Sequence, residues 1–207
     1  MTKFRPVTER HEKVIIVLGG ESLRGFDFGS LPADVPIITC NFVIEHIPRA
    51  EYWISIDNHR PRRWLPNRPP GPKYFYGVPE TATWLPTDIH GLRRMPRGPL
   101  CDDPREIVSG SSGYAAINLA YHFYARKGAV LGLDGEGGHF YDAGEPLIEV
   151  GHKDPEGYFD SFPGLFLMAV RQLQQRNCVV ANGSFHSRVD CFPRMSPNEA
   201  VRWLMND

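Results

Sequence analysis

The stretch "VLGGESLRGFDF", residues 17–28, continues the apolar run of residues 14–16 and then turns at two glycines followed closely by a serine. A strand that enters a tight glycine turn and then a helix is how parallel α/β proteins present backbone N–H groups to a phosphate. The same arrangement also serves as a plain structural corner, so the turn alone leaves both interpretations open. It predicts the first strand of an α/β fold.

Five more short runs of apolar and β-branched residues follow along the chain. Most are continuous instead of alternating, which is typical of strands covered on both faces and therefore of a parallel sheet. The six predicted strands lie at residues 14–18, 37–39, 52–56, 73–76, 129–133 and 178–181. This pattern predicts a single Rossmann-like α/β domain with a mostly parallel sheet and helices on both faces.

A long helix is expected to begin at a Ser111 or Ser112 cap in the stretch "SSGYAAINLAYHFYARKG". Its apolar residues recur at helical spacing. We predict that it ends at Gly128, behind Arg126 and Lys127, because basic residues suit the negative end of a helix and glycine suits the position after it.

Two further helices are expected in the last third of the chain. One begins near Asp160 or Ser161 and has Pro163 in its first turn, where proline is favoured. The other begins at Ser196, and Glu199 completes an S-x-x-E capping box.

The expected organisation is an N-terminal lead-in at residues 1–13 and one nucleotide-binding domain at residues 14–207. Residues 61–104 are rich in proline and arginine and lack periodicity. We predict an irregular connection there around one strand near Tyr74. The arginine clusters at residues 59–64 and 91–98 are expected to be ordinary solvated surface.

Composition narrows the class of partner. The chain has 207 residues, 42% of them hydrophobic, which suffices for one domain with a core. Its formal net charge of -1 removes the main electrostatic reason to expect a nucleic-acid or membrane-surface protein, so a small-molecule partner is expected. No apolar run approaches the ~18 residues of a membrane span. The sequence is compatible with a homo-oligomer.

The cysteines and histidines argue against a structural metal or disulfide framework. Widely spaced cysteines, without a C-x-x-C pair or a secretory leader, favour reduced thiols and a cytoplasmic protein. No two histidines have H-x-x-x-H spacing, so no metal site is expected. The cysteines are Cys40, Cys101, Cys178 and Cys191.

Several common nucleotide and hydrolase motifs are absent. There is no G-x-x-x-x-G-K-[ST], which excludes a P-loop, and "GSSG" at residues 110–113 lacks the spacing of a nucleophile elbow. The glycine-rich stretch at residues 132–142 lacks G-x-G-x-x-G, which argues against classical dinucleotide binding.

Polar and glycine residues follow four of the predicted strands and begin the long helix. Open parallel sheets bind ligands beyond the carboxyl ends of their strands, and a helix start is an anion site. Each position taken alone also has a plain structural role as a turn or cap. The candidate nucleotide-binding residues are Gly19, Gly20, Ser22, Asn41, Asp57, Ser111, Ser112, Gly113 and Asp134. His139 and His152, in glycine-flanked loops after the Asp134 strand, are candidate bases.

In this order, these residues resemble the bacterial lipo-oligosaccharide sialyltransferase family and a wider group that includes a pterin pyrophosphokinase. The family's G-N-G-P-S-L turn is similar to "VIIVLGGESL", and its D-x-x-x-L-P element is matched before the strand that ends at Asn41. The family's T-S-G helix start and G-I-D strand end resemble "SSG" at residues 111–113 and "GLD" at residues 132–134. The likeness extends from about residue 14 to "NGS" at residues 182–184.

The resemblance implies a catalytic pair and also contains departures. Tyr141 in "HFYD" is the candidate counterpart of the family's phosphate-binding tyrosines, and His152 in "VGHKD" that of its catalytic base. Gly19 stands where the family has an asparagine that contacts the donor, Glu21 replaces a proline, and Asp57 replaces an asparagine. An acidic side chain beside an anion site repels phosphate unless it turns away.

The activity implied by this resemblance is glycosyl transfer from a nucleotide-sugar, with a CMP-sugar favoured, to a glycan or other hydroxyl acceptor. The implied reaction is metal-independent and uses no cofactor besides the donor. The glycine turn and the helix start would hold the phosphate, and Asn41 and Asp57 would hold the nucleoside. Tyr141 would donate to the leaving phosphate, and His152 would take the acceptor proton.

Three alternatives stay open at this stage. A phosphotransferase or pyrophosphokinase of the related group would use Asp57 and Asp134 to hold Mg²⁺ against a triphosphate. A non-catalytic nucleotide-binding or partner-binding module, phage- or island-encoded, would use the glycine loops only as corners. A nucleic-acid-modifying role for the arginine clusters would show strongly salt-dependent DNA binding.

Overall fold

A parallel sheet with the strand order β6-β5-β4-β3-β2-β1-β7-β8 organises the molecule. The computed structural model describes residues 4–57, 65–82, 85–136, 138–141 and 155–206. Within these ranges, eight strands are present, and all seven pairings between neighbours are parallel. They are β1 (Lys13–Val17), β2 (Ile37–Cys40), β3 (Tyr52–Ser55), β4 (Lys73–Val78), β5 (His90–Arg97), β6 (Glu106–Ser109), β7 (Lys127–Leu131) and β8 (Val179–Gly183).

The six strands predicted from the sequence are confirmed, and the parallel α/β class with them. The prediction of a single strand within residues 61–104 is wrong, because β5 lies there beside β4. The first three residues of β5 are buried, Arg93, Arg94 and Met95 are partly buried, and Pro96 and Arg97 are exposed. Strand β6, of four residues, was also missed.

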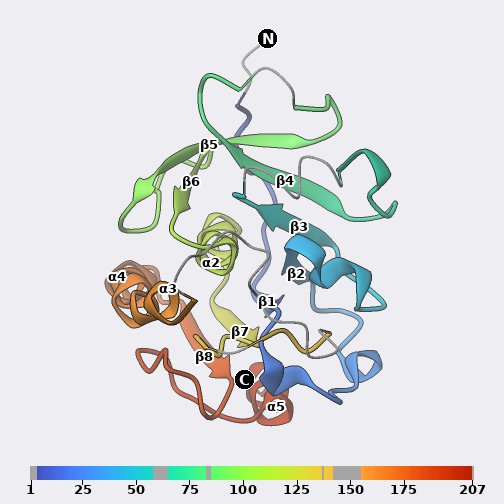
Figure 1. Ribbon diagram of the computed structural model, residues 1–207, viewed down its shortest axis with the longest axis vertical. Coiled ribbons are helices and arrows are strands. Elements are labelled where there is room, and N and C mark those ends of the chain that lie inside the picture. Colours follow the sequence, from blue (N-terminus) through green and yellow to red (C-terminus); the bar gives the residue numbers. More distant parts are fainter. Residues whose placement is uncertain (1–3, 58–64, 83–84, 137, 142–154, 207) are drawn as a thin grey trace.

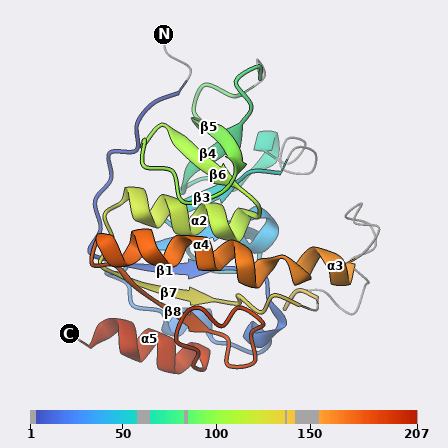
Figure 2. The same cartoon turned by 90° about the vertical axis from the view of Figure 1, so that its left-hand side faces the viewer.

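Helices cover both faces of this sheet (Figures 1 and 2). On one face, α2 (Ser112–His122) and α4 (Phe162–Gln175) pack over a core cluster that includes strand residues of β1, β2 and β7. On the other face, α5 (Pro197–Met205) packs through Ala200 and Leu204 against residues of β1 and β7. A short helix, α3 (Pro155–Asp160), precedes α4.

Helix starts follow their sequence signals closely. The Ser111 hydroxyl accepts a hydrogen bond from the Tyr114 backbone nitrogen at 3.0 Å and caps α2. Ser196 and Glu199 form the expected capping box at α5. Helix α4 begins after Ser161 with proline in its first turn, as predicted.

The predicted end of the long helix is wrong. Helix α2 ends at His122, because Tyr124 adopts a left-handed backbone with φ of 59° and the chain then turns into β7. Lys127 and Gly128, expected at the end of the helix, are the first residues of that strand. The basic residues that favoured a long helix therefore begin the next element.

Side chains of α2 cover the outer edge of β6. The buried Asn118 carboxamide oxygen accepts hydrogen bonds from the backbone nitrogens of Cys101 at 3.0 Å and Val108 at 3.1 Å. The ring of His122 lies 2.9 Å from the Glu106 carbonyl oxygen. Burial lowers the pKa of His122 to about 4, although the Glu106 carbonyl opposes this shift.

The chain also returns to the free edge of β8. The Asn182 nitrogen donates to the Pro193 carbonyl at 2.8 Å, and the Met195 nitrogen donates to the Asn182 carbonyl at 3.0 Å. The N-terminal segment packs on the rest of the protein. Val7 is buried, and its backbone nitrogen donates a hydrogen bond to the Pro104 carbonyl.

All four cysteines are free thiols, in agreement with the expectation of reduced cysteines. In the parts of the chain that the structure describes, no helix has both the length and the apolar character needed to cross a bilayer.

Candidate nucleotide-binding site

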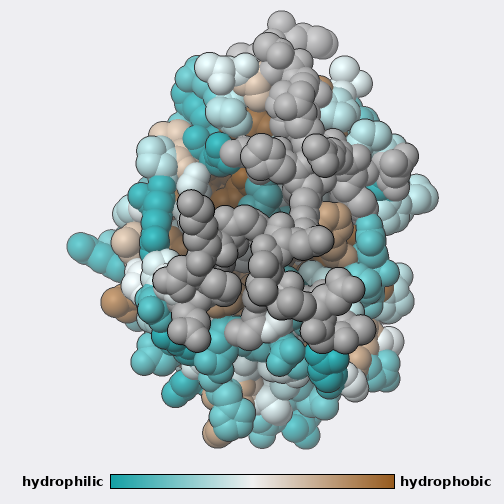
Figure 3. Space-filling model, viewed as in Figure 1, coloured by the Kyte–Doolittle hydropathy of each residue, from teal (hydrophilic) through white to brown (hydrophobic). Residues whose placement is uncertain are grey.

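A cavity of about 220 Å³ lies at the carboxyl edge of the sheet, beyond the ends of β1, β2, β3 and β7. Figure 1 looks onto this edge of the sheet. Seen in space-filling form, the same face has hydrophobic residues near its centre and mostly hydrophilic residues over its lower part (Figure 3). Strand β1 lies between β2 and β7, so the topology reverses direction here, which is where open α/β sheets bind ligands.

Eight of the nine predicted nucleotide-binding residues line this cavity. The ninth, Ser22, lines a neighbouring cavity instead. The eight are Gly19, Gly20, Asn41, Asp57, Ser111, Ser112, Gly113 and Asp134. The structure therefore brings together residues from four strand ends and one helix start.

The Asp57 carboxylate, after β3, bonds to two other elements of the site. Its Oδ2 accepts hydrogen bonds from Nδ2 of Asn41 at 2.6 Å and from the Ser112 hydroxyl at 3.2 Å. The Tyr76 hydroxyl also donates to the Asp57 carbonyl. The end of β2, the end of β3 and the start of α2 are thus held in one arrangement.

Asn41 has an unusual backbone conformation at the end of β2. Its φ is 50°, in the left-handed region that asparagine tolerates better than most residues. Its carbonyl oxygen accepts a hydrogen bond from the Trp53 indole at 2.7 Å. The buried Oδ1 of Asn41 has no hydrogen-bond partner among the described residues, and such an acceptor is costly unless a donor is supplied.

The start of α2 presents donors at the cavity. The Tyr114 and Ala115 nitrogens are both bonded to Ser111, so the first helical N–H groups still without a described acceptor are those of Ser112 and Gly113. A Cβ at Gly113 would lie 2.9 Å from the Leu18 side chain. Glycine here lets the helix start approach β1 closely, and the two N–H groups can bind an anion.

The turn after β1 already holds a carboxylate of the protein. The Asp134 side chain accepts hydrogen bonds from the Ser22 nitrogen at 2.8 Å and from the Ser22 hydroxyl at 2.6 Å. A Cβ at Gly20 would lie 2.5 Å from both the Asp134 Cγ and the Gly132 carbonyl oxygen. The Ser22 donors that were expected to face phosphate thus have a protein partner, and the glycine makes room for it.

His139 reaches the cavity beside Gly19. A side chain at position 19 would overlap the His139 ring, so the glycine leaves the space that the imidazole fills. The His139 ring stacks on Tyr141 with centroids 4.9 Å apart, and Tyr141 stacks on His46 at 4.2 Å. His139 lines the cavity. Tyr141, which was expected to donate a hydrogen bond to the phosphate, stacks between the imidazoles of His139 and His46.

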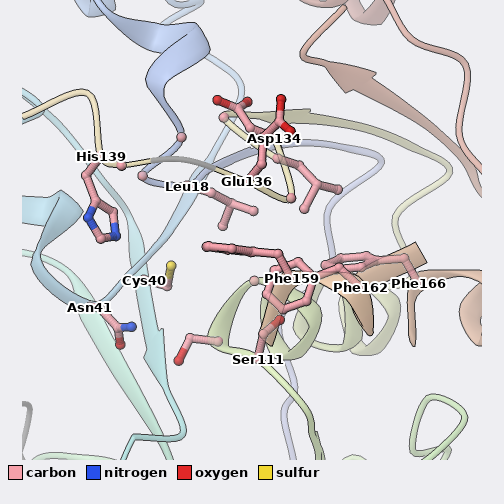
Figure 4. A pocket seen from close by; sticks show the side chains of 18 of the residues that line it. Leu18, Cys40, Asn41, Ser111, Asp134, Glu136, His139, Phe159, Phe162 and Phe166 are labelled. Atoms are coloured by element: carbon pink, nitrogen blue, oxygen red, sulfur yellow. The ribbon is translucent and has the colours of Figure 1, made fainter. Parts of the chain in front are cut away.

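An apolar wall was missed in the sequence analysis. The rings of Phe159, Phe162 and Phe166 lie on one side of the cavity, opposite His139 and Asn41 (Figure 4). The aromatic spacing in "FDSFPGLF", residues 159–166, was the available signal.

The cavity is acidic in the described part of the structure. Its lining includes the carboxylates of Asp57, Asp134 and Glu136 but no described lysine or arginine. Burial, with a smaller effect of the Asp57 carboxylate, raises the pKa of the Cys40 thiol to about 12, so this thiol stays protonated. No group of three or more potential metal ligands occurs among the described residues. The predicted base, His152, lies outside them.

Comparison with known proteins finds a solved structure with a similar fold. No protein-family model and no curated protein sequence matches the chain. Among solved structures, the sialyltransferase CstII from Campylobacter jejuni in complex with the substrate analogue CMP-3FNeuAc is similar, with a TM-score of 0.54 and 12% identity over 91% of this chain and 87% of that one. A second structure, sialyltransferase CST-II with a trisaccharide acceptor and CMP, aligns with a TM-score of 0.44 and 12% identity over 90% and 86% of the two chains.

Proposed function

We propose that the cavity binds a nucleotide-sugar, with a CMP-sugar favoured, and that the protein transfers the sugar to an acceptor hydroxyl. The observation that carries this proposal is the meeting of the α2 N-terminal N–H groups with the Asn41–Asp57 pair in one cavity. An anion site beside polar groups that can read a nucleoside is what such a donor requires. The shared fold with a sialyltransferase is consistent with it.

The charge of the cavity favours a donor with a single phosphate. Three carboxylates line it, and the described lining contains no lysine or arginine to offset them. Each added phosphate charge would be repelled by these carboxylates in a site of reduced dielectric. A nucleoside monophosphate ester is therefore favoured over a nucleoside diphosphate sugar.

In the proposed arrangement, the N–H groups of Ser112 and Gly113 bind the phosphate. Asn41 and Asp57 hold the nucleoside, and the Phe159 ring supplies an apolar contact for a flat group of the donor. His139 lines the cavity, so we assign the hydrogen bond to the leaving phosphate to its imidazole. Tyr141, first expected in that role, then positions His139 through the ring stack.

The proposed reaction needs little covalent chemistry from the protein. The acceptor oxygen attacks the anomeric carbon, the bond from that carbon to the phosphate oxygen breaks, and the acceptor proton passes to His152. The electron pair of the broken bond leaves with the nucleoside monophosphate. Because a phosphate is a good leaving group, the reaction as proposed requires no metal and no further cofactor.

A thermal-shift panel of CMP, UDP, GDP and ATP, each with and without Mg²⁺, tests this proposal. Ligands that bind only the native state raise the melting temperature, so CMP is expected to do so without Mg²⁺. Stabilisation by ATP only with Mg²⁺ would instead favour a phosphotransferase. His152→Ala is expected to abolish transfer and keep CMP affinity, and unchanged turnover would reject His152 as base.

A further inference from the structure

A second cavity, of about 300 Å³, adjoins the first at the same edge of the sheet. The two cavities share Asp134 and Glu136 in their linings. The other side of the second cavity is formed by Ser184, Phe185 and His186, directly after β8, and by the start of α5. A molecule bound there would be separated from the first cavity only by these two acidic residues and their loop.

Phe185 is the unusual residue of this cavity. It is 60% exposed, although it follows the buried Ser184 at the end of a strand. Its ring contacts that of His186 edge-on, with centroids 5.2 Å apart. A large aromatic side chain that borders a cavity and remains open to solvent offers a flat apolar surface to a ligand.

The polar groups around Phe185 select the chemistry of that ligand. Glu136 is exposed and supplies carboxylate oxygens, which accept hydrogen bonds, and Ser184 and His186 add further polar groups. The carboxylates of Asp134 and Glu136 line this cavity and no described lysine or arginine does, so a negatively charged ligand would be repelled there. A neutral molecule with many hydroxyls fits, because hydroxyls donate to carboxylates and the C–H face of a sugar ring packs on an aromatic ring.

We infer that this second cavity binds the acceptor, and that the acceptor is a neutral sugar whose ring packs on Phe185. The inference rests on the proposed transfer, and it adds where the acceptor binds and of what class it is. Donor and acceptor would then occupy adjoining cavities, with the reacting hydroxyl directed past Asp134 and Glu136. This arrangement gives the reacting groups the proximity that transfer requires.

The test uses the full chain and two variants at exposed apolar positions. Phe185→Ala removes the proposed contact, and Leu167→Ala, on the outer face of α4 and 61% exposed, is the matched control. Saturation-transfer NMR measures binding of lactose, maltose and cellobiose, with glucuronic acid as the negatively charged comparison. We expect a neutral disaccharide to bind the wild type and the control, and at least about 10-fold weaker binding to Phe185→Ala.

A second measurement separates this inference from the proposed function. CMP-sugar hydrolysis without acceptor reports on the first cavity, and Phe185→Ala is expected to leave its rate unchanged while raising the acceptor KM. If the wild type does not hydrolyse a CMP-sugar, the proposed function is wrong. Sugar binding that depends on Phe185 would still support a sugar site in the second cavity. Equal sugar binding by the two variants, no binding of any neutral disaccharide, or preference for glucuronic acid would overturn the inference.

Discussion

The Asp134 carboxylate holds Ser22 through two hydrogen bonds, from the backbone nitrogen at 2.8 Å and from the hydroxyl at 2.6 Å. The two residues lie 112 positions apart in the sequence. They follow β7 and β1, which are neighbours in the sheet. A carboxylate of the protein thus occupies the donors of a turn that resembles a phosphate-binding loop.

This pair predicts a coupled effect on stability. Ser22→Ala and Asp134→Asn are each expected to lower the free energy of unfolding by about 1 kcal/mol, because each weakens the charge-assisted bonds at a partly exposed site. The double variant is expected to lose less than the sum, with a coupling energy above about 0.5 kcal/mol. Urea denaturation measures all four proteins, and additive losses would mean that the two residues do not interact.

Gly19 predicts a second, different coupling. Gly19→Ala is expected to displace the His139 ring, because the new methyl group would overlap it. If His139 contacts the donor, Gly19→Ala and His139→Ala each weaken CMP binding, and the double variant is no weaker than the worse single variant. Calorimetric titration gives the affinities. Gly98→Ala is the control, since a Cβ there meets nothing within 4 Å.

Asn118 predicts a large loss of stability far from the cavity. Asn118→Ala leaves the buried backbone nitrogen of Val108 and the partly buried one of Cys101 without their acceptor, which costs about 2–4 kcal/mol. Thermal or urea denaturation measures this loss. The affinity of the folded protein for CMP is expected to stay unchanged. Gln174→Ala, which truncates an exposed amide on α4, should change stability by less than about 0.5 kcal/mol.

His122 predicts how stability depends on pH. Its pKa is about 4 in the folded protein against 6.5 for an ordinary histidine, so the unfolded chain binds the proton first as pH falls. Stability therefore decreases between about pH 6.5 and 4, by about 3 kcal/mol from this group, and no further below that. In His122→Gln the decrease between pH 7 and 4 should be smaller by roughly this amount. An identical pH profile in both proteins would contradict a buried neutral imidazole.

The pattern of apolar and capping residues along the sequence predicted most of the fold. Continuous apolar runs located six strands because both faces of those strands are buried, and capping residues located the starts of α2 and α5. Strand β5 was missed because its second half is arginine-rich and contains a proline, so neither alternation nor a continuous apolar run was visible. The end of α2 was misplaced because the left-handed backbone at Tyr124 has no glycine to signal it.

The sequence predicted where the residues of the candidate site lie, but not which side chains bond to one another there. Parallel strands bring their carboxyl ends to one edge, so glycines and polar residues after strands converged as expected. Local sequence does not encode the pairing of Ser22 with Asp134, which depends on β1 and β7 being adjacent. The same holds for the stacking of Tyr141 between two histidines from different loops.

Both outer edges of the sheet are occupied by the chain's own groups. At β6, Asn118 and His122 bond the Val108 nitrogen and the Glu106 carbonyl, and at β8 the segment around Arg194 pairs with Asn182. Unpaired strand edges are templates for the addition of strands from other molecules. These contacts hinder the addition of a strand at either edge, and Asn118→Ala would expose a backbone donor of β6 to such pairing as well as weaken the fold.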